Sequence, residues 1–266
     1  MIPLALFLGG SVIAIPVVTG IAEGVQEQKK QNEEAANETR MIKFNIYVHC
    51  EDEHELADDI DEGIIVLRHN KVWVVPRDIE ARKPIPPKQG LTPELHAFAG
   101  FFIQYPDDER CPVERGLVST ISDDPPVLNW IYVNNDTYAL AYGNRTASIT
   151  HMVGAWDWTD DERYIMLDGF EGFIAVDEGI DPSTEWGKEG LRWAVYFDND
   201  DDGLKKKKGK RRAFEIGLER VCQSAEEQLK QLEDADKKMQ VKTRGGLSTQ
   251  FTAPGAEARM KKKEAA

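Results

Sequence analysis

The stretch that decides the fold covers residues 116–198, where short apolar segments alternate with Gly, Asn and Asp. The segments are GLVSTIS (116–122), PPVLNWIYV (125–133), TYALAYG (137–143), ASITHMV (147–153), GAWDWTDDERYIMLDGFEGFIAVDE (154–178) and LRWAVYFD (191–198). Turn residues recur about every 8 to 12 positions, a spacing typical of sandwiches and barrels rather than of βαβ units. We therefore predict a mainly β fold, an antiparallel sandwich or barrel of about 10–12 short strands.

The residues around this stretch extend the β pattern to residues 41–222. MIKFNIYV (41–48) alternates apolar and polar residues as a half-buried strand does. GIIVLRHNKVWVVP (63–76) predicts a hairpin that turns at His69 and Asn70, because Asn tolerates a positive φ. Four prolines between residues 77 and 96 predict a long surface loop. AFEIGLERV (213–221) predicts a strand that forms a hairpin with LRWAVYFD across a long charged loop.

The N-terminal segment, residues 1–22, is uncharged after the terminal amine and long enough to cross a bilayer as an apolar helix. A membrane anchor, a cleaved signal peptide and an apolar helix that packs on protein all remain open. Lys and Arg follow this segment and none precedes it, which favours a membrane-associated chain whose body faces the cytosol. Residues 23–40 are predicted as a polar helical stalk.

The C-terminal part is predicted as an amphipathic helix (223–244) followed by a disordered tail (245–266). The 266 residues carry a net charge of −14, unevenly spread. From Lys205 onward there are 17 Lys and Arg against 9 Asp and Glu, so residues 1–204 hold 16 basic against 38 acidic residues. Such an acidic body repels phosphates, which argues against a nucleic-acid partner. Three cysteines in so long a chain are no disulfide framework and favour a reducing compartment.

The loop that follows Phe197 carries two charged motifs. Asp198, Asp200 and Asp202, followed by Gly203, match the first half of a calcium loop. The twelfth position, which should supply a bidentate Glu, is Gly209, so an acidic hairpin tip is the favoured interpretation. The basic patch that follows is typical of a nuclear-import signal, an anionic-surface contact or a solvated loop; it consists of Lys205, Lys206, Lys207, Lys208, Lys210, Arg211 and Arg212.

Other candidate sites are less complete. His49, Cys50 and His54 lie close together without a full set of metal ligands. The carboxylates after Trp156 resemble a sugar-site pair only if their separation is fixed, and a solvated turn is the simpler interpretation. Three N-glycosylation sequons, which matter only for a lumenal or secreted body, begin at Asn37, Asn135 and Asn144. No catalytic residue, cofactor site or complete metal site is predicted.

The chain resembles a conserved family of uncharacterised proteins of filamentous fungi in the segments GLVSTISDDPPVLNWIYV…YGNRTASI, GAWDWTDDE and WAVYFDNDDDGL. The resemblance covers residues 41–222. It implies that the β body is a recurring unit, and it implies no activity, ligand or catalytic residue.

These features favour a non-catalytic β-rich interaction module, tethered to a membrane by residues 2–22 and facing an unidentified protein partner. Two alternatives remain. One is a small-molecule-binding barrel or an enzyme of a fungal secondary-metabolite pathway, which would require a pocket lined by Trp and Tyr. The other is a secreted or lumenal glycoprotein.

Overall fold

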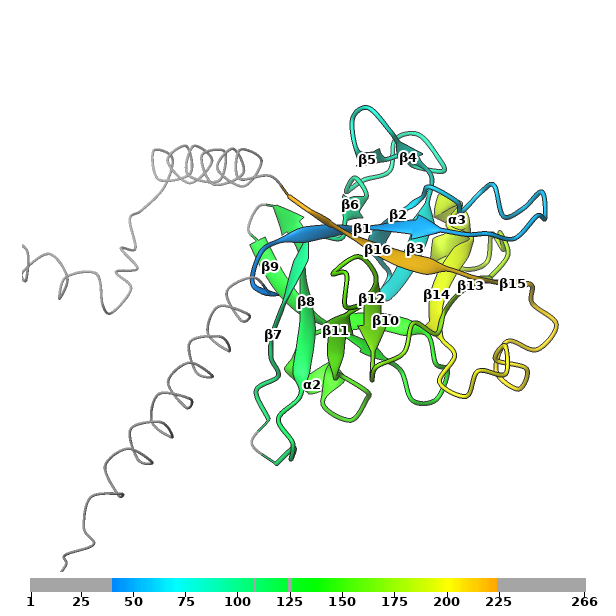
Figure 1. Ribbon diagram of the computed structural model, residues 1–266. Helices are drawn as coiled ribbons and strands as arrows, with labels where there is room; N and C mark the ends of the chain where they lie inside the picture. Colours follow the sequence, from blue (N-terminus) through cyan, green and yellow to red (C-terminus); the bar gives the residue numbers. More distant parts are fainter. Residues whose placement is uncertain (1–39, 108, 124–125, 224–266) are drawn as a thin grey trace, which may run out of the picture. The chain divides into compact units, whose positions relative to one another are not determined.

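The computed structural model describes residues 40–107, 109–123 and 126–223 (Figure 1). The predictions for the apolar segment 1–22, for residues 23–39 of the stalk, for the C-terminal helix beyond residue 223 and for the tail lie outside the described residues. Within the described ranges, no helix is long and apolar enough to cross a membrane.

The described chain is mainly β, and every pair of strands with a defined register is antiparallel, which confirms the predicted class. The strands are β1 (Phe44–His49), β2 (Ile64–Arg68), β3 (Lys71–Val75), β4 (Arg77–Asp78), β5 (Lys83–Pro84), β6 (His96–Ala97), β7 (Gly100–Gln104), β8 (Arg115–Asp123), β9 (Pro126–Val133), β10 (Leu140–Gly143), β11 (Trp156–Trp158), β12 (Ile165–Leu167), β13 (Phe173–Asp177), β14 (Trp193–Phe197), β15 (Ala213–Glu215) and β16 (Gly217–Cys222). Two short helices, α2 (Arg145–Ser148) and α3 (Glu185–Glu189), complete the described elements.

Six of the strands that contribute to the main core form a barrel. β16 pairs with β1, β1 with β7, and β7 with β8, while β11 pairs with β12. β12 meets β16 through a bridge between Tyr164 and Glu219. Each of these strands contributes a buried apolar side chain to one cluster, for example Phe44, Phe102 and Leu218. The arrangement is a barrel filled by side chains, with a gap in the ladder between β8 and β11.

Three hairpins meet beside this barrel. They are β2–β3, β9–β10 and β13–β14. β3 pairs with both β10 and β14, and a bridge joins Ala139 to Tyr196. A second apolar cluster, which includes Trp73, Ala139 and Tyr196, fills the space between the hairpins. The hairpins therefore converge on one point, where β3 is the shared neighbour.

The β2–β3 turn forms as the sequence predicts. Arg68 pairs with Lys71 across the two-residue turn. His69 and Asn70 have φ values of 51° and 57°, which are the two positive values of a type I′ turn. The indole nitrogen of Trp73 donates to the carbonyl of Arg68 at 2.8 Å and further fixes the hairpin end.

The predicted hairpin across the charged loop is wrong. β15 pairs with β13, as Ala175 opposite Phe214, and not with β14. A loop as long as residues 198–212 does not dictate which strand its end will meet, whereas a two-residue turn does. Burial of Phe214 in the main core decides the pairing instead.

Two helices replace predicted strand or loop. The segment 147–153 was expected as a strand, but Asn144 caps α2 by accepting from the backbone nitrogen of Ala147 at 3.0 Å. α3 begins after Thr184, whose hydroxyl accepts from Gly187, and ends at Gly190 with a φ of 81°. The Pro-rich loop 77–96 contains the short β4–β5 pair and, at its end, β6.

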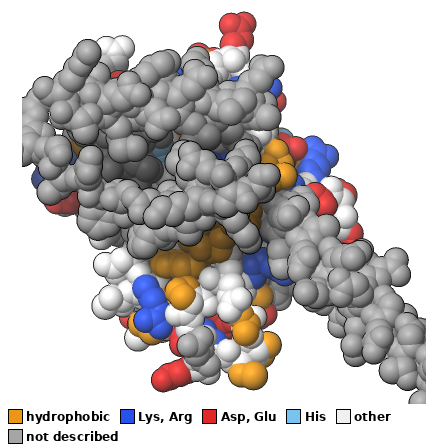
Figure 2. Space-filling model, turned by 90° about the vertical axis from the view of Figure 1, so that its left-hand side faces the viewer, with side chains coloured by type: hydrophobic (Ala, Val, Ile, Leu, Met, Phe, Trp, Pro, Cys, Tyr) orange, Lys and Arg blue, Asp and Glu red, His pale blue; other side chains and the backbone are white. Residues whose placement is uncertain are grey.

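Hydrophobic side chains gather on the side of the molecule that carries β7, β8 and β9 in Figure 1, as Figure 2 shows. Val113, which precedes β8, and Leu128, on β9, are among the exposed large apolar residues. All three cysteines are free thiols: Cys50 is buried, and Cys111 and Cys222 are exposed.

Gly100, on β7, gives the first prediction, because a side chain at this position would collide with β8. A Cβ atom at Gly100 would lie 2.1 Å from the carbonyl oxygen of Val118 and 2.4 Å from the Phe98 ring. We expect Gly100→Ala to lower the free energy of unfolding by about 1–3 kcal/mol, as overpacking does. Urea unfolding followed by circular dichroism measures the effect. Gly217→Ala is the control, because its nearest neighbour is the Tyr164 side chain at 3.1 Å. Equal midpoints for the two variants would contradict the prediction.

Candidate functional site

A groove of about 440 Å³ lies where the end of β1 and the start of β16 approach the starts of β12 and β13. We call it the acidic groove. Its lining combines acidic, aromatic and aliphatic residues: His49, Glu51, Tyr164, Phe170, Glu171, Gly172, Phe173, Ile174, Asp198, Asp201, Glu215, Ile216 and Gly217.

Four exposed carboxylates surround the acidic groove: Glu51, Glu171, Asp201 and Glu215. No hydrogen bond or ion pair joins them to another side chain in the part of the chain that the structure describes. A hollow lined by charges of one sign concentrates the electrostatic potential and attracts ions of the opposite sign. A cation at the acidic groove therefore keeps most of its hydration water and is attracted by the carboxylates.

Two aromatic rings form walls of the same groove. Phe170 is 39% exposed, and its ring packs edge-on against Phe197 at 6.1 Å between centroids. Gly172 permits this position, because a Cβ there would lie 2.1 Å from the Phe170 ring. Tyr164 lies edge-on to His49 at 6.2 Å. The ring faces offer apolar contact and cation–π attraction beside the carboxylates.

One side of the acidic groove is fixed by an ion-pair chain. His49 Nε2 lies 2.6 Å from Glu219 Oε2, and Arg163 Nε donates to Glu219 Oε1 at 3.0 Å. Burial acts to raise the pKa of Glu219, but the hydrogen bonds from His49 and Arg163 outweigh it, so the pKa is lowered. Glu219 therefore stays ionised and holds the His49 ring in place.

The calcium candidate forms a closed turn at the edge of the groove. The buried carboxylate of Asp198 accepts backbone N–H groups from Gly203 at 2.6 Å and Asp202 at 3.3 Å. The carboxylate of Asp202 in turn accepts from the nitrogen of Lys205 at 3.2 Å, and Asp200 is exposed. Among the described residues, no group of three His, Cys, Asp or Glu is placed to hold a metal ion. The Asp198 oxygens are used to shape the loop.

The basic patch divides into exposed and anchored members. Lys205, Lys206 and Lys210 are exposed. Lys207 donates to the carbonyl of Asp136 at 2.6 Å, and Arg212 contacts His54. Lys208 and Arg211 are half-buried, so only part of the patch is available to an outside partner.

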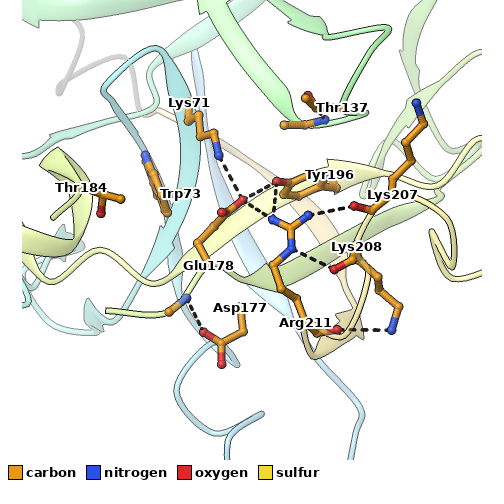
Figure 3. A network of polar contacts seen from close by, with 12 residues as sticks. Lys71, Trp73, Thr137, Asp177, Glu178, Thr184, Tyr196, Lys207, Lys208 and Arg211 are labelled. Atoms are coloured by element: carbon orange, nitrogen blue, oxygen red, sulfur yellow. Dashed lines mark hydrogen bonds and ion pairs between the residues drawn. The ribbon is translucent and has the colours of Figure 1, made fainter. Parts of the chain in front are cut away.

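Arg211 belongs to a network at the point where the hairpins meet (Figure 3). Its Nη1 donates to Glu178 Oε1 at 2.9 Å and to the hydroxyl of Tyr196 at 3.1 Å. Lys71 donates to the same Glu178 oxygen at 3.0 Å, and the Tyr196 hydroxyl donates to it as well. The Lys71 ammonium lies 4.9 Å from the centre of the Trp186 ring. One carboxylate thus joins β3, β14 and the charged loop.

This environment shifts two pKa values. Burial and the hydrogen bond to Glu178 raise the pKa of Tyr196 to about 12. Burial acts to raise the pKa of Glu178, but the hydrogen bonds and charges of Tyr196, Lys71 and Arg211 outweigh it and lower the pKa. Sequence reasoning missed this network because Lys71 and Glu178 are 107 residues apart and no local motif connects them.

The remaining predicted positions are scattered. Asn135 and Asn144 are exposed; the amide of Asn135 donates to the carbonyl of Thr150 at 3.0 Å, and Asn37 lies outside the described residues. Asp157 binds Arg40 and Arg115 and is not paired with a second carboxylate. Burial raises the pKa of the Cys50 thiol. Cys50, His49 and His54 form no metal-binding group among the described residues.

Tyr196 supplies a prediction about alkaline stability. The pKa of Tyr196 in the folded state, about 12, exceeds the ordinary value of 10. Its contribution to the free energy of unfolding is therefore fully present below pH 10 and is lost as the pH rises from 10 to 12. At about 1.4 kcal/mol per pKa unit, this contribution is roughly 3 kcal/mol. We expect Tyr196→Phe to remove this alkaline loss, measured by urea unfolding between pH 8 and about 12. Tyr164→Phe, at the groove, is the control and should keep the wild-type pH profile. An unchanged profile in Tyr196→Phe would refute the assignment.

Comparison with known proteins gives one match. A family model described as "Fungal beta-trefoil domain" matches residues 20–224. No curated protein and no solved structure matches the chain. The expected resemblance to a conserved fungal family is confirmed, and the barrel with three converging hairpins is the architecture that the family's description names.

Proposed function

Because the chain belongs to the fungal β-trefoil domain family, we propose that it is a non-catalytic binding module whose binding surface is the acidic groove. The observation that carries the proposal is the set of four exposed carboxylates, which have no side-chain partner among the described residues and lie beside the exposed Phe170 ring. The ligand that this chemistry favours is a basic segment of a partner protein, in which Lys or Arg alternates with apolar side chains.

The placement of the carboxylates supports a ligand with several positive charges. The carboxylates come from four separate parts of the chain, on the loop after β1, before β13, after β14 and on β15. Separate carboxylates are suited to several cationic side chains spaced along a peptide, each retaining part of its water. The volume of about 440 Å³ is within the ordinary range for ligand sites.

The binding proposal predicts the effect of neutralising groove carboxylates. We expect Glu171→Gln and Glu215→Gln each to weaken binding of a synthetic Lys-Leu-Lys-Leu-Lys peptide about three- to tenfold, because each removes attraction worth roughly 1 kcal/mol. Titration calorimetry at low and at physiological salt measures the binding, which should weaken with salt.

Glu80→Gln is the matched control, because Glu80 is equally exposed but lies on the Pro-rich loop. A Glu-Leu-Glu-Leu-Glu peptide serves as the ligand of opposite charge. Equal losses in Glu80→Gln and Glu171→Gln, or equal affinity for the two peptides, would reject the acidic groove as a specific site.

We further propose that residues 2–22 tether the chain to a membrane and that the β body faces the cytosol. The uncharged length of this segment and the Lys and Arg that follow it support the proposal. A chain that lacks residues 1–22 should move from the membrane fraction to the soluble fraction when cells are fractionated. Unchanged membrane association would reject the tether.

A second experiment distinguishes the secreted alternative. A cytosolic body keeps Asn135 and Asn144 unmodified, so treatment with an N-glycosidase should leave the mass of the full chain unchanged. A mass loss that disappears in Asn135→Gln and Asn144→Gln would place the body in the lumen or outside the cell and overturn the proposed orientation.

A further inference from the structure

A second pocket, of about 310 Å³, lies on the Pro-rich loop, between β5 and the start of β6 (Figure 1). We call it the proline-loop pocket. Its lining includes one cation, one anion and four apolar side chains: Lys83, Glu94, Pro84, Pro86, Leu91 and Leu95. It shares no residue with the acidic groove, so a ligand of this pocket is independent of the proposed function.

The chain's own contacts hold both walls of the proline-loop pocket. β5 pairs with β4, and the backbone nitrogen of Ile85 donates to the carbonyl of Pro76 at 2.8 Å. On the other side, β6 pairs with β2, and Leu95, just before β6, packs against the second apolar cluster. Between the walls, Lys88 donates to the carbonyl of Lys188 on α3. Because these contacts hold the walls, a ligand has little of the loop to order when it binds.

Two opposite charges of the pocket are left without a counter-charge. Lys83 and Glu94 are exposed, and no hydrogen bond or ion pair joins either side chain to another group in the part of the chain that the structure describes. The two groups therefore do not neutralise each other, and the pocket presents a positive and a negative charge at separate places. A ligand with a single charge is attracted by one of them and repelled by the other.

The rest of this lining is hydrocarbon. Pro84, Leu91 and Leu95 are half-buried, and Pro86 is exposed. An apolar group that covers these side chains removes their surface from water, which favours binding. The volume of about 310 Å³ corresponds to roughly ten water molecules at about 30 Å³ each, so it admits a ligand with roughly ten non-hydrogen atoms.

We propose that the proline-loop pocket binds an apolar amino acid in its zwitterionic form. The carboxylate of the ligand lies toward Lys83 and its ammonium toward Glu94. The hydrocarbon side chain of the ligand lies against Leu91, Leu95 and Pro86. Only a ligand with both charges is complementary to both charged groups, and only one with a hydrocarbon part uses the apolar lining. Leucine is of the size that the volume admits.

Four ligands test the proposal in nuclear magnetic resonance titrations of the full chain at neutral pH. Leucine is compared with isopentylamine and isocaproate, which carry the same branched hydrocarbon with one charge each, and with glycine, which carries both charges and no side chain. We expect leucine to bind about threefold more tightly than each of the other three, because an exposed ion pair changes an equilibrium constant by up to about fivefold.

The same titrations locate the ligand. The backbone resonances of Gly90, Leu91 and Leu95, which line the pocket, should shift as leucine is added. Leucine that binds no more tightly than one of the comparison ligands, or that leaves these three resonances unshifted, would overturn the proposal.

Two variants test the charges one at a time. Lys83→Gln should weaken leucine binding about threefold and remove the preference for leucine over isopentylamine, whereas Glu94→Gln should remove the preference for leucine over isocaproate. Both side chains are exposed, so the variants should fold. Glu80→Gln is the matched control, because Glu80 is exposed on the same loop and lies outside the pocket. Equal leucine affinities of Glu80→Gln and the two pocket variants would contradict the assigned roles and reject the site.

Discussion

The pairing of the first and last strands is the constraint on which the other elements depend. β1 and β16 form a six-residue antiparallel ladder from Phe44 opposite Cys222 to His49 opposite Gly217. Because β1 also pairs with β7 and β2, this ladder closes the barrel and sets the position of both neighbours. Residues about 170 positions apart must meet before the core can form, so the closure carries a large chain-entropy cost that burial of Phe44, Ile46 and Leu218 offsets.

The half-buried carboxylate of Glu178 performs a related task for two of the hairpins, β2–β3 and β13–β14, and for the charged loop. Glu178 accepts from Lys71, Tyr196 and Arg211, so a single side chain links strands that no short turn could bring together. A buried ion pair of this kind adds little stability over an apolar contact, but removal of one partner leaves a charge unpaired. The network therefore specifies which hairpins meet more than it strengthens their contact. It also holds Arg211, and through it the neighbouring part of the charged loop, against the body.

The features that could be predicted from the sequence are those that local interactions determine. The His69–Asn70 turn follows from two residues that accept positive φ, and the antiparallel class follows from alternation and turn spacing. The pairing of β15 with β13 could not be predicted, because a long loop leaves the partner strand undetermined. α3 did leave a signal, since Thr184 and Gly190 are typical cap residues that bracket it. The acidic groove combines residues from distant segments, so it becomes visible only once the strands are placed.

The β1–β16 ladder also positions the acidic groove. His49 and Gly217 are paired at one end of the ladder, and both line the groove. Glu51 follows His49 by two residues, and Glu215 precedes Gly217 by two residues, so the register of the ladder brings these two carboxylates to the same end of the barrel. The strand pairing that closes the barrel therefore also assembles part of the proposed binding surface.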